Sequence, residues 1–415
     1  LADTLWASWR VDVARARPGA EVTPYLDTLP ERVSQTGGDL AQAALRARLI
    51  DKIGNRTAFA RRMVEIVGQD QQRTPGRWSS VALSDYAAAT QPSALATGAA
   101  VGVVYVAGNI VDGEAPPGTA GGETIARLVE EALKSGDVKA LVVRVDSPGG
   151  SVLASERIRA AIVDARRPVL PVGASMGSVA ASGGYWVSPA AETIYAEPAT
   201  ITGSIGVFGI IPTFERTLDK IGVKASGMKT TPYSGEPNIF NGLSPEVKQV
   251  LQLSVENSYQ RFINLVAHSR GMTPQRVDEV AQGRVWAGVT ARELGLVDKM
   301  GTLDAAVEEA ARRAGLDPDK TRVIAIEKTP SLPFQVLNDW VRPTGTGESI
   351  AADPYAMFAR RAQANLLGSV ADAASIAGGA TLQARCLECA IAMVRPTTPS
   401  NSLSWSNLLG KLLAK

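Results

Sequence analysis

The chain has 415 residues and a nearly balanced charge, with 43 basic side chains against 41 acidic ones for a formal net charge of +2. This length is enough for about two or three domains with substantial cores. No dense basic stripe with interleaved aromatic residues is present, which excludes the usual nucleic-acid surface. The sequence also contains no GxxxxGKS or GxxxxGKT phosphate loop, no signal peptide and no run of roughly 18 uncharged apolar residues that would span a bilayer.

The first 99 residues divide into a helical part, 1–68, and a connection, 69–99, rich in Gln, Arg, Ser, Pro and Ala. One short strand is predicted in the connection, around Trp78–Leu83. Residues 49–54 read LIDKIG and echo 296–301, which read LVDKMG. The residues before each copy correspond as well, since Trp6, Trp9, Val13, Ala14 and Arg17 stand where Tyr259, Phe262, Val266, Ala267 and Arg270 stand. We therefore expect an internal repeat of which the first copy shows its end.

Residues 100–315 alternate between apolar runs and helical patterns. The apolar runs are 101–107, 140–145, 168–174 and 193–196, and the helical patterns are 121–135, 151–166 and 178–188. Such alternation predicts an α/β domain of stacked βαβ units. Helices are expected to dominate after residue 244, where Ser244 and Pro245 make a capped helix start.

Two glycine-bearing turns each close a strongly apolar run in this domain. The first reads DSPGG at 146–150, between a β-branched strand and a helix N-terminus, and the second lies in SMGSVAASGGYW at 175–186. Glycine lets a backbone approach a substrate closely or adopt positive φ. Alone, the first turn would be an ordinary βα connection. Together, the turns predict an oxyanion cradle with the N–H groups of Gly150 and Gly183 as donors, facing Ser182 as the nucleophile.

The base that would activate Ser182 is constrained by the histidine count, because the chain has one histidine, His268. His268 follows an apolar stripe near the last turn of a predicted helix over 255–270, where capping or surface exposure explains it. A Ser-His-Asp triad is therefore disfavoured. The remaining candidate is a lysine kept neutral by burial, since an amine with a pKa of about 10.4 would be protonated.

Several motifs together resemble the signal peptide peptidase A family, most closely its long, tandem-repeat bacterial form, also called protease IV. They are DSPGGS at 146–151, SMG and AASGGYW at 175–186, TGSIGVFG at 202–209, and GRVWAG with GLVDKMG at 283–301. The resemblance covers residues 1–330 well and the tail weakly. It implies a fold akin to ClpP and crotonase with helical extensions, and a serine peptidase with a Ser-Lys dyad that needs no metal or organic cofactor.

The resemblance also implies roles for individual residues. Ser182 matches the family nucleophile, and Gly150 and Gly183 match the oxyanion donors. Ser204, in the TGSIG motif, matches a serine that orients the lysine, although a turn serine bonded to local backbone explains it equally well.

The lysine departs from the pattern of short, single-repeat relatives, because the register of their catalytic lysine falls near Ser234 here. In the long form, the resemblance implies that the first repeat supplies the base and the second the serine. The chain also begins with Leu1 instead of methionine, so we expect the base to lie in a missing upstream segment. Lys229 is the best local substitute, with Lys224 next.

The implied substrates are cleaved signal peptides and other hydrophobic peptides, bound as an added β-strand. The resemblance further implies a homo-oligomer on the periplasmic face of the bacterial inner membrane, attached by an anchor upstream of Leu1. Two alternatives stay open. One is a crotonase-like enzyme acting on acyl-CoA thioesters, and the other is an assembly half that is inert without its upstream lysine.

Residues 316–415 are predicted to form a C-terminal extension. Cys386 and Cys389, the chain's two cysteines, form a CxxC that cannot complete a four-ligand zinc site. A strained disulfide, a redox pair and an inert or structural pair remain, of which we favour the last. The final stretch, 403–415, is amphipathic and is explained by a surface helix or frayed tail, or by contact with a membrane or a subunit.

Overall fold

The computed structural model describes residues 1–70, 72, 77–90, 98–166, 170–211, 213–222, 230–231, 233–236, 240, 242–327 and 382–386. The chain divides into two compact units, with the boundary between Gly98 and Ala99. Both glycine turns lie in the second unit. The division into 1–68, 69–99, 100–315 and 316–415 expected from the sequence stays a prediction.

The first unit is helical in its described residues. Its helices are α1 (Ala2–Ala16), α2 (Val22–Asp27), α3 (Leu29–Ser34), α4 (Leu40–Arg46), α5 (Arg56–Val67) and α6 (Leu83–Thr90). Two of them begin where the sequence supplies a side-chain cap. The carboxylate of Asp39 accepts a hydrogen bond from the N–H of Gln42 at the start of α4, and the amide oxygen of Asn55 accepts one at the start of α5.

The strand predicted around Trp78–Leu83 is wrong. Trp78 forms an isolated antiparallel bridge with Gln69, and Leu83 already begins α6. The indole of Trp78 packs edge-on against Phe59 of α5, with ring centroids 5.7 Å apart. The apolar side chain of Trp78, which suggested a strand, therefore packs against a helix. In the residues that follow, three consecutive alanines favour a helix.

The two segments that the sequence predicts to be copies of a repeat share an arginine–aspartate pair as well as matching residues. Arg17 donates to both carboxylate oxygens of Asp51, at 2.7 and 3.1 Å, and Arg270 donates to both oxygens of Asp298, at 2.5 and 2.9 Å. Each arginine also donates to the carbonyl oxygen three residues before the aspartate. These matching contacts support the internal repeat.

The second unit is built on an eight-stranded sheet. Its strands are β1 (Ala100–Ala107), β4 (Val138–Ser147), β6 (Val172–Ala181), β7 (Thr193–Ala196), β8 (Ile201–Gly203), β10 (Val285–Ala287), β11 (Lys299–Met300) and β12 (Arg322–Ile326). The main order is β10-β8-β6-β4-β1-β12, and β7 joins β6 to β11. All these pairs are parallel except that of β10 with β8.

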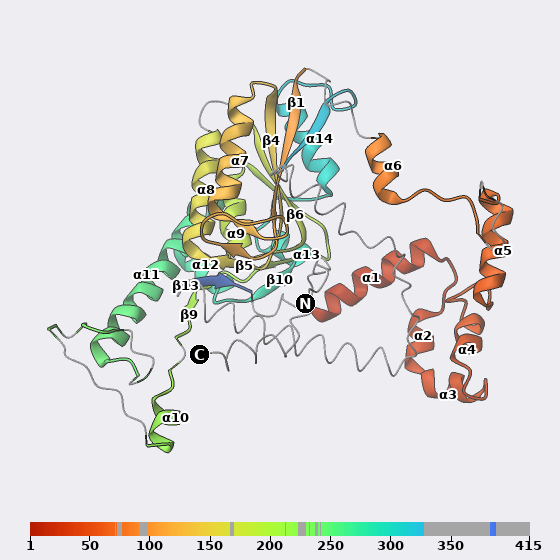
Figure 1. Ribbon diagram of the computed structural model, residues 1–415, viewed down its shortest axis with the longest axis horizontal. Coiled ribbons are helices and arrows are strands. Elements are labelled where there is room, and N and C mark those ends of the chain that lie inside the picture. The colour runs from red at the N-terminus through yellow and green to blue at the C-terminus, as the bar shows by residue number, and fades with distance from the viewer. Residues whose placement is uncertain are drawn as a thin grey trace. The chain divides into compact units, whose positions relative to one another are not determined.

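Helices cover both faces of this sheet (Figure 1). Helices α7 (Gly122–Lys134) and α8 (Val152–Arg166) lie on one side and α14 (Leu303–Arg313) on the other. Leu141 and Val143 of β4 belong to the cluster under α7 and α8, whereas Ala140 and Val142 pack with α14. A strand buried on both faces reads as a continuous apolar run, as the sequence of β4 does. The α/β class with stacked βαβ units is thereby confirmed.

One predicted helix and one predicted strand are displaced. The helical pattern over 178–188 is wrong in its first half, because β6 continues to Ala181 and the helix α9 spans Gly183–Val187, followed by a 3₁₀ turn over Ser188–Ala190. The strand predicted over 168–174 overlaps β6 from Val172 onward. Tertiary pairing decides the outcome: the last three residues of β6 pair with all of β8, and this parallel ladder outweighs the helix preference of alanine.

A second, smaller sheet carries the first glycine turn. It is ordered β3 (Ala120–Gly121), β2 (Ile110–Val111), β5 (Gly149–Ser151), β13 (Leu382–Arg385) and β9 (Phe208–Gly209). The other described helices of this unit are α10 (Glu215–Lys220), α11 (Pro245–Arg270), α12 (Pro274–Val280) and α13 (Gly288–Glu293).

Helix α11 follows the sequence expectation closely. The hydroxyl of Ser244 accepts a hydrogen bond from the N–H of Val247 at 3.3 Å, and Gly271 ends the helix in the left-handed conformation. Phe262 and Val266 are buried, and His268 lies exposed in the last turn. In the part of the chain that the structure describes, no helix is long and apolar enough to cross a membrane.

The Arg270–Asp298 pair ties α11 to the sheet, because Asp298 also accepts the N–H of Ile194 in β7 at 2.7 Å. Burial alone would raise the pKa of Asp298, but hydrogen bonds from Arg270 and from this N–H lower it. Since the folded pKa is depressed, the stabilisation is present at neutral pH and is lost as the pH falls through the folded value.

We therefore expect Asp298→Asn to lower the free energy of unfolding by about 2–3 kcal/mol at pH 7. Urea unfolding at neutral and acidic pH measures this, and the gap to the parent protein should narrow in acid. The exposed Asp304, in the first turn of α14, is the matched control, and its change to asparagine should cost at most about 1 kcal/mol. A gap for Asp298→Asn that does not change with pH contradicts the expectation.

Candidate active site

Ser182 lies in a strained turn between β6 and α9. Its φ is 53° and its ψ −112°, a conformation that residues other than glycine adopt at a cost of about 1–3 kcal/mol. The N–H of Ser182 donates to the carbonyl oxygen of Gly203 at 2.8 Å, and its carbonyl oxygen accepts from the N–H of Trp186 at 2.7 Å. The residue is fully buried, and its hydroxyl donates to the carbonyl oxygen of Gly206 at 3.4 Å. Fixed neighbours on both sides therefore hold the strained turn.

The aromatic pair that ends the second motif anchors the helix after Ser182. The hydroxyl of Tyr185 donates to the carbonyl oxygen of Leu296 at 2.8 Å, and burial raises the pKa of this phenol. The indole N–H of Trp186 donates to a carboxylate oxygen of Glu156 at 2.8 Å, and its ring packs on Phe262 with centroids 4.5 Å apart. Burial opposes ionisation of Glu156, but hydrogen bonds from Arg159 and Trp186 lower its pKa. These contacts fix the position of α9 and of the turn that precedes it.

The two glycine turns meet next to this serine. Gly149 and Gly150 have φ values of 95° and 153°. A Cβ on Gly149 would lie 2.5 Å from the backbone nitrogen of Gly183, and one on Gly150 would lie 2.8 Å from the carbonyl carbon of Ile110. A Cβ on Gly183 would lie 2.6 Å from the hydroxyl of Ser155. The structure thus brings together the three predicted residues Gly150, Ser182 and Gly183, in a space that has no room for added side-chain atoms.

Polar side chains of the first motif hold that turn in place, a role that the sequence analysis missed. The carboxylate of Asp146 accepts the N–H of Val179 at 3.0 Å and so links the end of β4 to β6. The hydroxyl of Ser147 donates to the carbonyl oxygen of Gly108 at 2.6 Å and accepts the N–H of Gly149 at 3.1 Å. The sequence feature that could have revealed this role is the pair of polar residues at the end of an apolar strand. Buried polar groups are usually hydrogen-bonded, and such bonds can hold a neighbouring turn in place.

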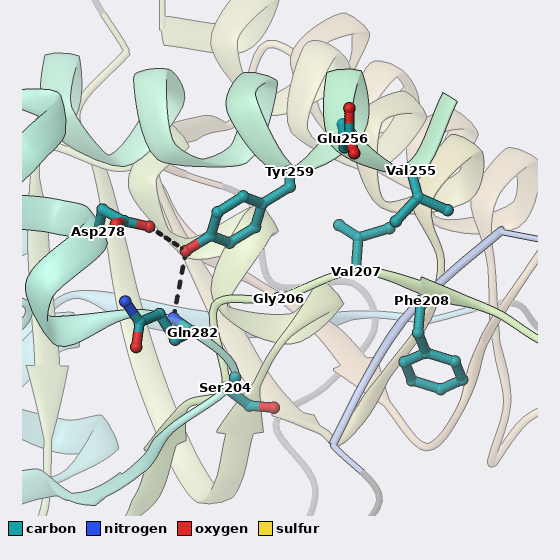
Figure 2. Close-up of a pocket in the computed structure, with 10 residues that line it drawn as sticks. Ser204, Gly206, Val207, Phe208, Val255, Glu256, Tyr259, Asp278 and Gln282 are labelled. Carbon is teal, nitrogen blue, oxygen red and sulfur yellow. Dashed lines mark hydrogen bonds between the residues drawn. The ribbon is translucent and has the colours of Figure 1, made fainter. Parts of the chain in front are cut away.

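Ser204 lies one residue beyond the strand that pairs with the end of β6. Its φ is 49°, and its N–H donates to the carbonyl oxygen of Arg284 at 2.7 Å. Ser204 and Gly206 line a pocket of about 560 Å³ (Figure 2). Because the hydroxyl of Ser182 bonds to the carbonyl oxygen of Gly206, this pocket adjoins the serine.

The opposite wall of the pocket comes from α11 and α12. Figure 2 shows the side chain of Tyr259 pointing toward Asp278 and Gln282. Its hydroxyl donates to the Asp278 carboxylate at 2.5 Å and accepts the N–H of Gln282 at 3.3 Å. Burial, together with the bond to Asp278, raises the pKa of Tyr259 to about 12. The phenol therefore stays protonated at neutral pH and is unsuited to act as a base.

No lysine occurs among the lining residues of this pocket or among the hydrogen-bond partners of Ser182, as far as the structure describes the chain. Lys229 and Lys224 lie outside the described residues. Ser234 sits in a turn, where its hydroxyl accepts the N–H groups of Thr230 and Thr231. The described residues also contain no group of three or more His, Cys, Asp or Glu side chains that could hold a metal ion.

A segment from the C-terminal region lies against the first glycine turn. Ala384 of β13 is opposite Gly150, and the N–H of Cys386 donates to the carbonyl oxygen of Pro148 at 2.7 Å. Cys386 is disulfide-bonded. Of the alternatives that the CxxC left open, the structure thus shows a disulfide, which is compatible with a structural pair; Cys389 lies outside the described residues.

Comparison with known proteins agrees with this geometry. The model of peptidase family S49 matches residues 164–317, which include Ser182 and Ser204. Protease 4 of Salmonella typhi is 41% identical over 314 residues, which are 75% of this chain and 50% of that protein. The chain thus spans half the length of this relative.

A Synechocystis sp. protein whose name describes it as a protease is 40% identical over 204 residues, which are 48% of this chain and 73% of that protein. Among solved structures, a ClpP1 variant from Listeria monocytogenes is similar with a TM-score of 0.33 and 14% identity, over 49% of this chain and 94% of that one. That likeness is too loose to bear on the fold, and the sequence matches decide the family. The chain belongs to peptidase family S49, as do the signal peptide peptidase A proteins of the protease 4 type.

Proposed function

We propose that the chain is the nucleophile-bearing part of a serine endopeptidase that hydrolyses hydrophobic peptides, cleaved signal peptides among them, with a Ser-Lys dyad. The observation that carries this proposal is the position of Ser182. It is buried in a strained turn between two glycine-bearing segments, which approach each other so closely that neither accepts a Cβ. Membership of a peptidase family supports the same chemistry.

In this mechanism the hydroxyl of Ser182 attacks the peptide carbonyl carbon while its proton passes to a neutral lysine. The N–H groups of Gly150 and Gly183 then stabilise the oxyanion, and each such donor lowers the barrier by roughly 3–4 kcal/mol. The lysine returns the proton to the leaving amine, and water hydrolyses the acyl-enzyme in a second step. Because the donors are backbone groups of fixed turns, they need no reorganisation during the reaction.

The base enters, on this proposal, from the pocket lined by Ser204. Its walls carry the hydroxyl of Ser204 and the carboxylates of Glu256 and Asp278, and the Gly206 carbonyl oxygen already bonded to Ser182 lies beside them. A lysine amine that donates to Ser204 would be oriented toward Ser182. Burial would lower the pKa of this amine, whereas the two carboxylates would raise it, so the proposed base requires that burial has the larger effect. The upstream repeat is our candidate source of this lysine, with Lys229 as the local substitute.

The proposal also covers how peptides bind, whether the protein forms an oligomer, and where in the cell it lies. Peptides would bind as an added strand, with backbone hydrogen bonds giving affinity and side-chain pockets giving preference. A homo-oligomer attached to the periplasmic face of the bacterial inner membrane is supported by the resemblance to signal peptide peptidase A.

The test compares hydrolysis of a quenched hydrophobic peptide by this 415-residue chain and by a form extended upstream through the first repeat. We expect the extended form to be faster by roughly 100-fold or more, since removal of general base catalysis costs about that much. Lys229→Ala should leave the extended form unchanged. If instead the 415-residue chain cleaves and Lys229→Ala abolishes cleavage, the dyad is local. Activity on an acyl-CoA thioester that survives Ser182→Ala would point to a crotonase-like enzyme.

A further inference from the structure

The loop that follows β8 carries two residues that bear on Ser182. Ser204 is the proposed partner of the base, and the carbonyl oxygen of Gly206 accepts the hydroxyl of Ser182 at 3.4 Å. Ser204 has a φ of 49°, a conformation that residues other than glycine adopt at a cost, so its neighbours must hold it. Gly206 lies so close to Gly283 that an added Cβ would be 3.1 Å from the Cα atom of Gly283. The position of this loop therefore depends on the segment around Gly283.

That segment, the loop 281–284 between α12 and β10, is hydrogen-bonded to the loop after β8 through backbone groups. The N–H of Ser204 donates to the carbonyl oxygen of Arg284 at 2.7 Å, and the N–H of Gly283 donates to the carbonyl oxygen of Ile205 at 3.0 Å. These two bonds continue the antiparallel pairing of β8 with β10. A shift of the loop 281–284 would therefore be passed directly to Ser204.

The phenol of Tyr259 holds the loop 281–284 against α11 and α12. Gln282 has a φ of 58°, so its conformation also needs support from its neighbours. The N–H of Gln282 donates to the hydroxyl of Tyr259 at 3.3 Å, and this hydroxyl donates to the carboxylate of Asp278 at 2.5 Å. Figure 2 shows both hydrogen bonds as dashed lines. One hydroxyl group thus joins the two helices and the loop.

The predicted repeat offers a comparison within the chain. Trp6 stands where Tyr259 stands, so the first copy has no phenol at this place. Ser34 stands where Asp278 stands, since the five residues that end there read PERVS and PQRVD. The arginine–aspartate pair described above, in contrast, occurs in both copies. A contact that the fold requires is expected in both copies, so a tyrosine–aspartate pair found in the copy with Ser182 alone favours a role in the reaction.

We propose that Tyr259, together with Asp278, is a positioning residue of the peptidase. By holding the loop 281–284, the pair keeps Ser204 and the carbonyl group of Gly206 in the places that the serine and its base require. The proposal rests on the function proposed above and adds residues to the same site. Because its hydroxyl is bonded to Asp278 and to a backbone N–H, Tyr259 acts through the loop and not on the substrate.

The test is Tyr259→Phe in the upstream-extended protein, which removes the hydroxyl and keeps the ring. We expect kcat on the quenched peptide to fall roughly tenfold and KM to stay within about twofold, since misplaced reacting groups slow the reaction without weakening substrate binding. The acidic limb of the pH–rate profile of kcat should also shift, because Ser204 moves relative to the base. A smaller folded fraction would instead lower kcat by the same factor at every pH.

Variants of Asp278 test whether the two residues act as a pair. Asp278→Ala should reproduce both changes, and it carries the test should Tyr259→Phe not fold. Asp278→Asn should keep the parent values, because the amide oxygen still accepts a hydrogen bond from the phenol. Tyr105→Phe is the matched control, since Tyr105 is a half-buried tyrosine of β1 that packs with the cluster under α14. It should match the parent in both measurements.

Amide hydrogen exchange gives a readout that needs no catalysis. The N–H groups of Ser204 and Gly283 should exchange at least roughly tenfold faster in Tyr259→Phe than in the parent, since the loop that protects them is released. Parent values of kcat, of the acidic limb or of exchange in Tyr259→Phe would overturn the proposal. Hydrolysis that survives Ser182→Ala, or a parent that does not hydrolyse the peptide, would instead count against the proposed function, and exchange alone would then decide whether Tyr259 holds the loop.

Discussion

Replacing Gly150 with alanine should reduce peptide hydrolysis by roughly 100-fold or more, because it displaces one of the two proposed oxyanion donors. Gly150 has a φ of 153°, and an added Cβ would collide with the backbone carbonyl of Ile110. The added atom meets main chain on β2, which cannot rotate away as a side chain would. The turn must therefore shift, and with it the N–H that we propose as an oxyanion donor.

The effect should appear mainly in kcat, because the oxyanion forms in the transition state and not in the bound substrate. Steady-state kinetics on the quenched peptide measure it, and circular dichroism confirms that the variant is folded. Gly136→Ala is the matched control, since Gly136 has a φ of 71° but nothing within 4 Å of an added Cβ. It shares the backbone strain without the collision, so it should keep its activity. Equal kcat for both variants would remove Gly150 from the proposed mechanism.

Replacing Ser182 with alanine should lower hydrolysis by about 10⁴-fold or more, as loss of the nucleophile does in serine peptidases. Stability should change little, because the hydroxyl makes one long hydrogen bond to the residues that the structure describes, at 3.4 Å to Gly206. The matched control is Ser188→Ala, which removes another buried serine hydroxyl, one that donates to the carbonyl oxygen of Gly184. Loss of activity in both variants to the same degree would indicate a folding defect and not a missing nucleophile.

Ser204→Ala separates the two interpretations of that residue. A serine that positions the lysine should, when removed, lower kcat by roughly 10–100-fold and shift the acidic limb of the pH–rate profile, which reports the pKa of the base, because the lysine loses a hydrogen-bond partner. A turn serine that satisfies local backbone would leave the pH–rate profile unchanged.

The main features of the catalytic unit could be predicted from its sequence because they are local. Strand β4 is a run of apolar residues long enough to cross the sheet, and helices α7 and α8 precede and follow it at the expected places. The glycine turns were identifiable because Pro148, Gly149 and Gly150 interrupt an apolar pattern at a strand end.

The errors have long-range causes. The segment before Ser182 is rich in alanine and valine, which fit a helix or a strand, and its pairing with β8 decided between them. Strand β13 is four residues long and owes its extended form to partners more than 170 positions earlier in the chain, which no local pattern reveals. The roles of Asp146 and Ser147 depend on acceptors and donors from other elements and were missed for the same reason.

The most direct test of the central claim, that Ser182 is the nucleophile, is to treat the upstream-extended protein with a fluorophosphonate and locate the adduct by mass spectrometry. We predict one adduct, on Ser182, formed at a rate that hydrophobic peptides slow by competition. A folded extended protein that carries the adduct on another serine, or that does not react at all, would contradict the account.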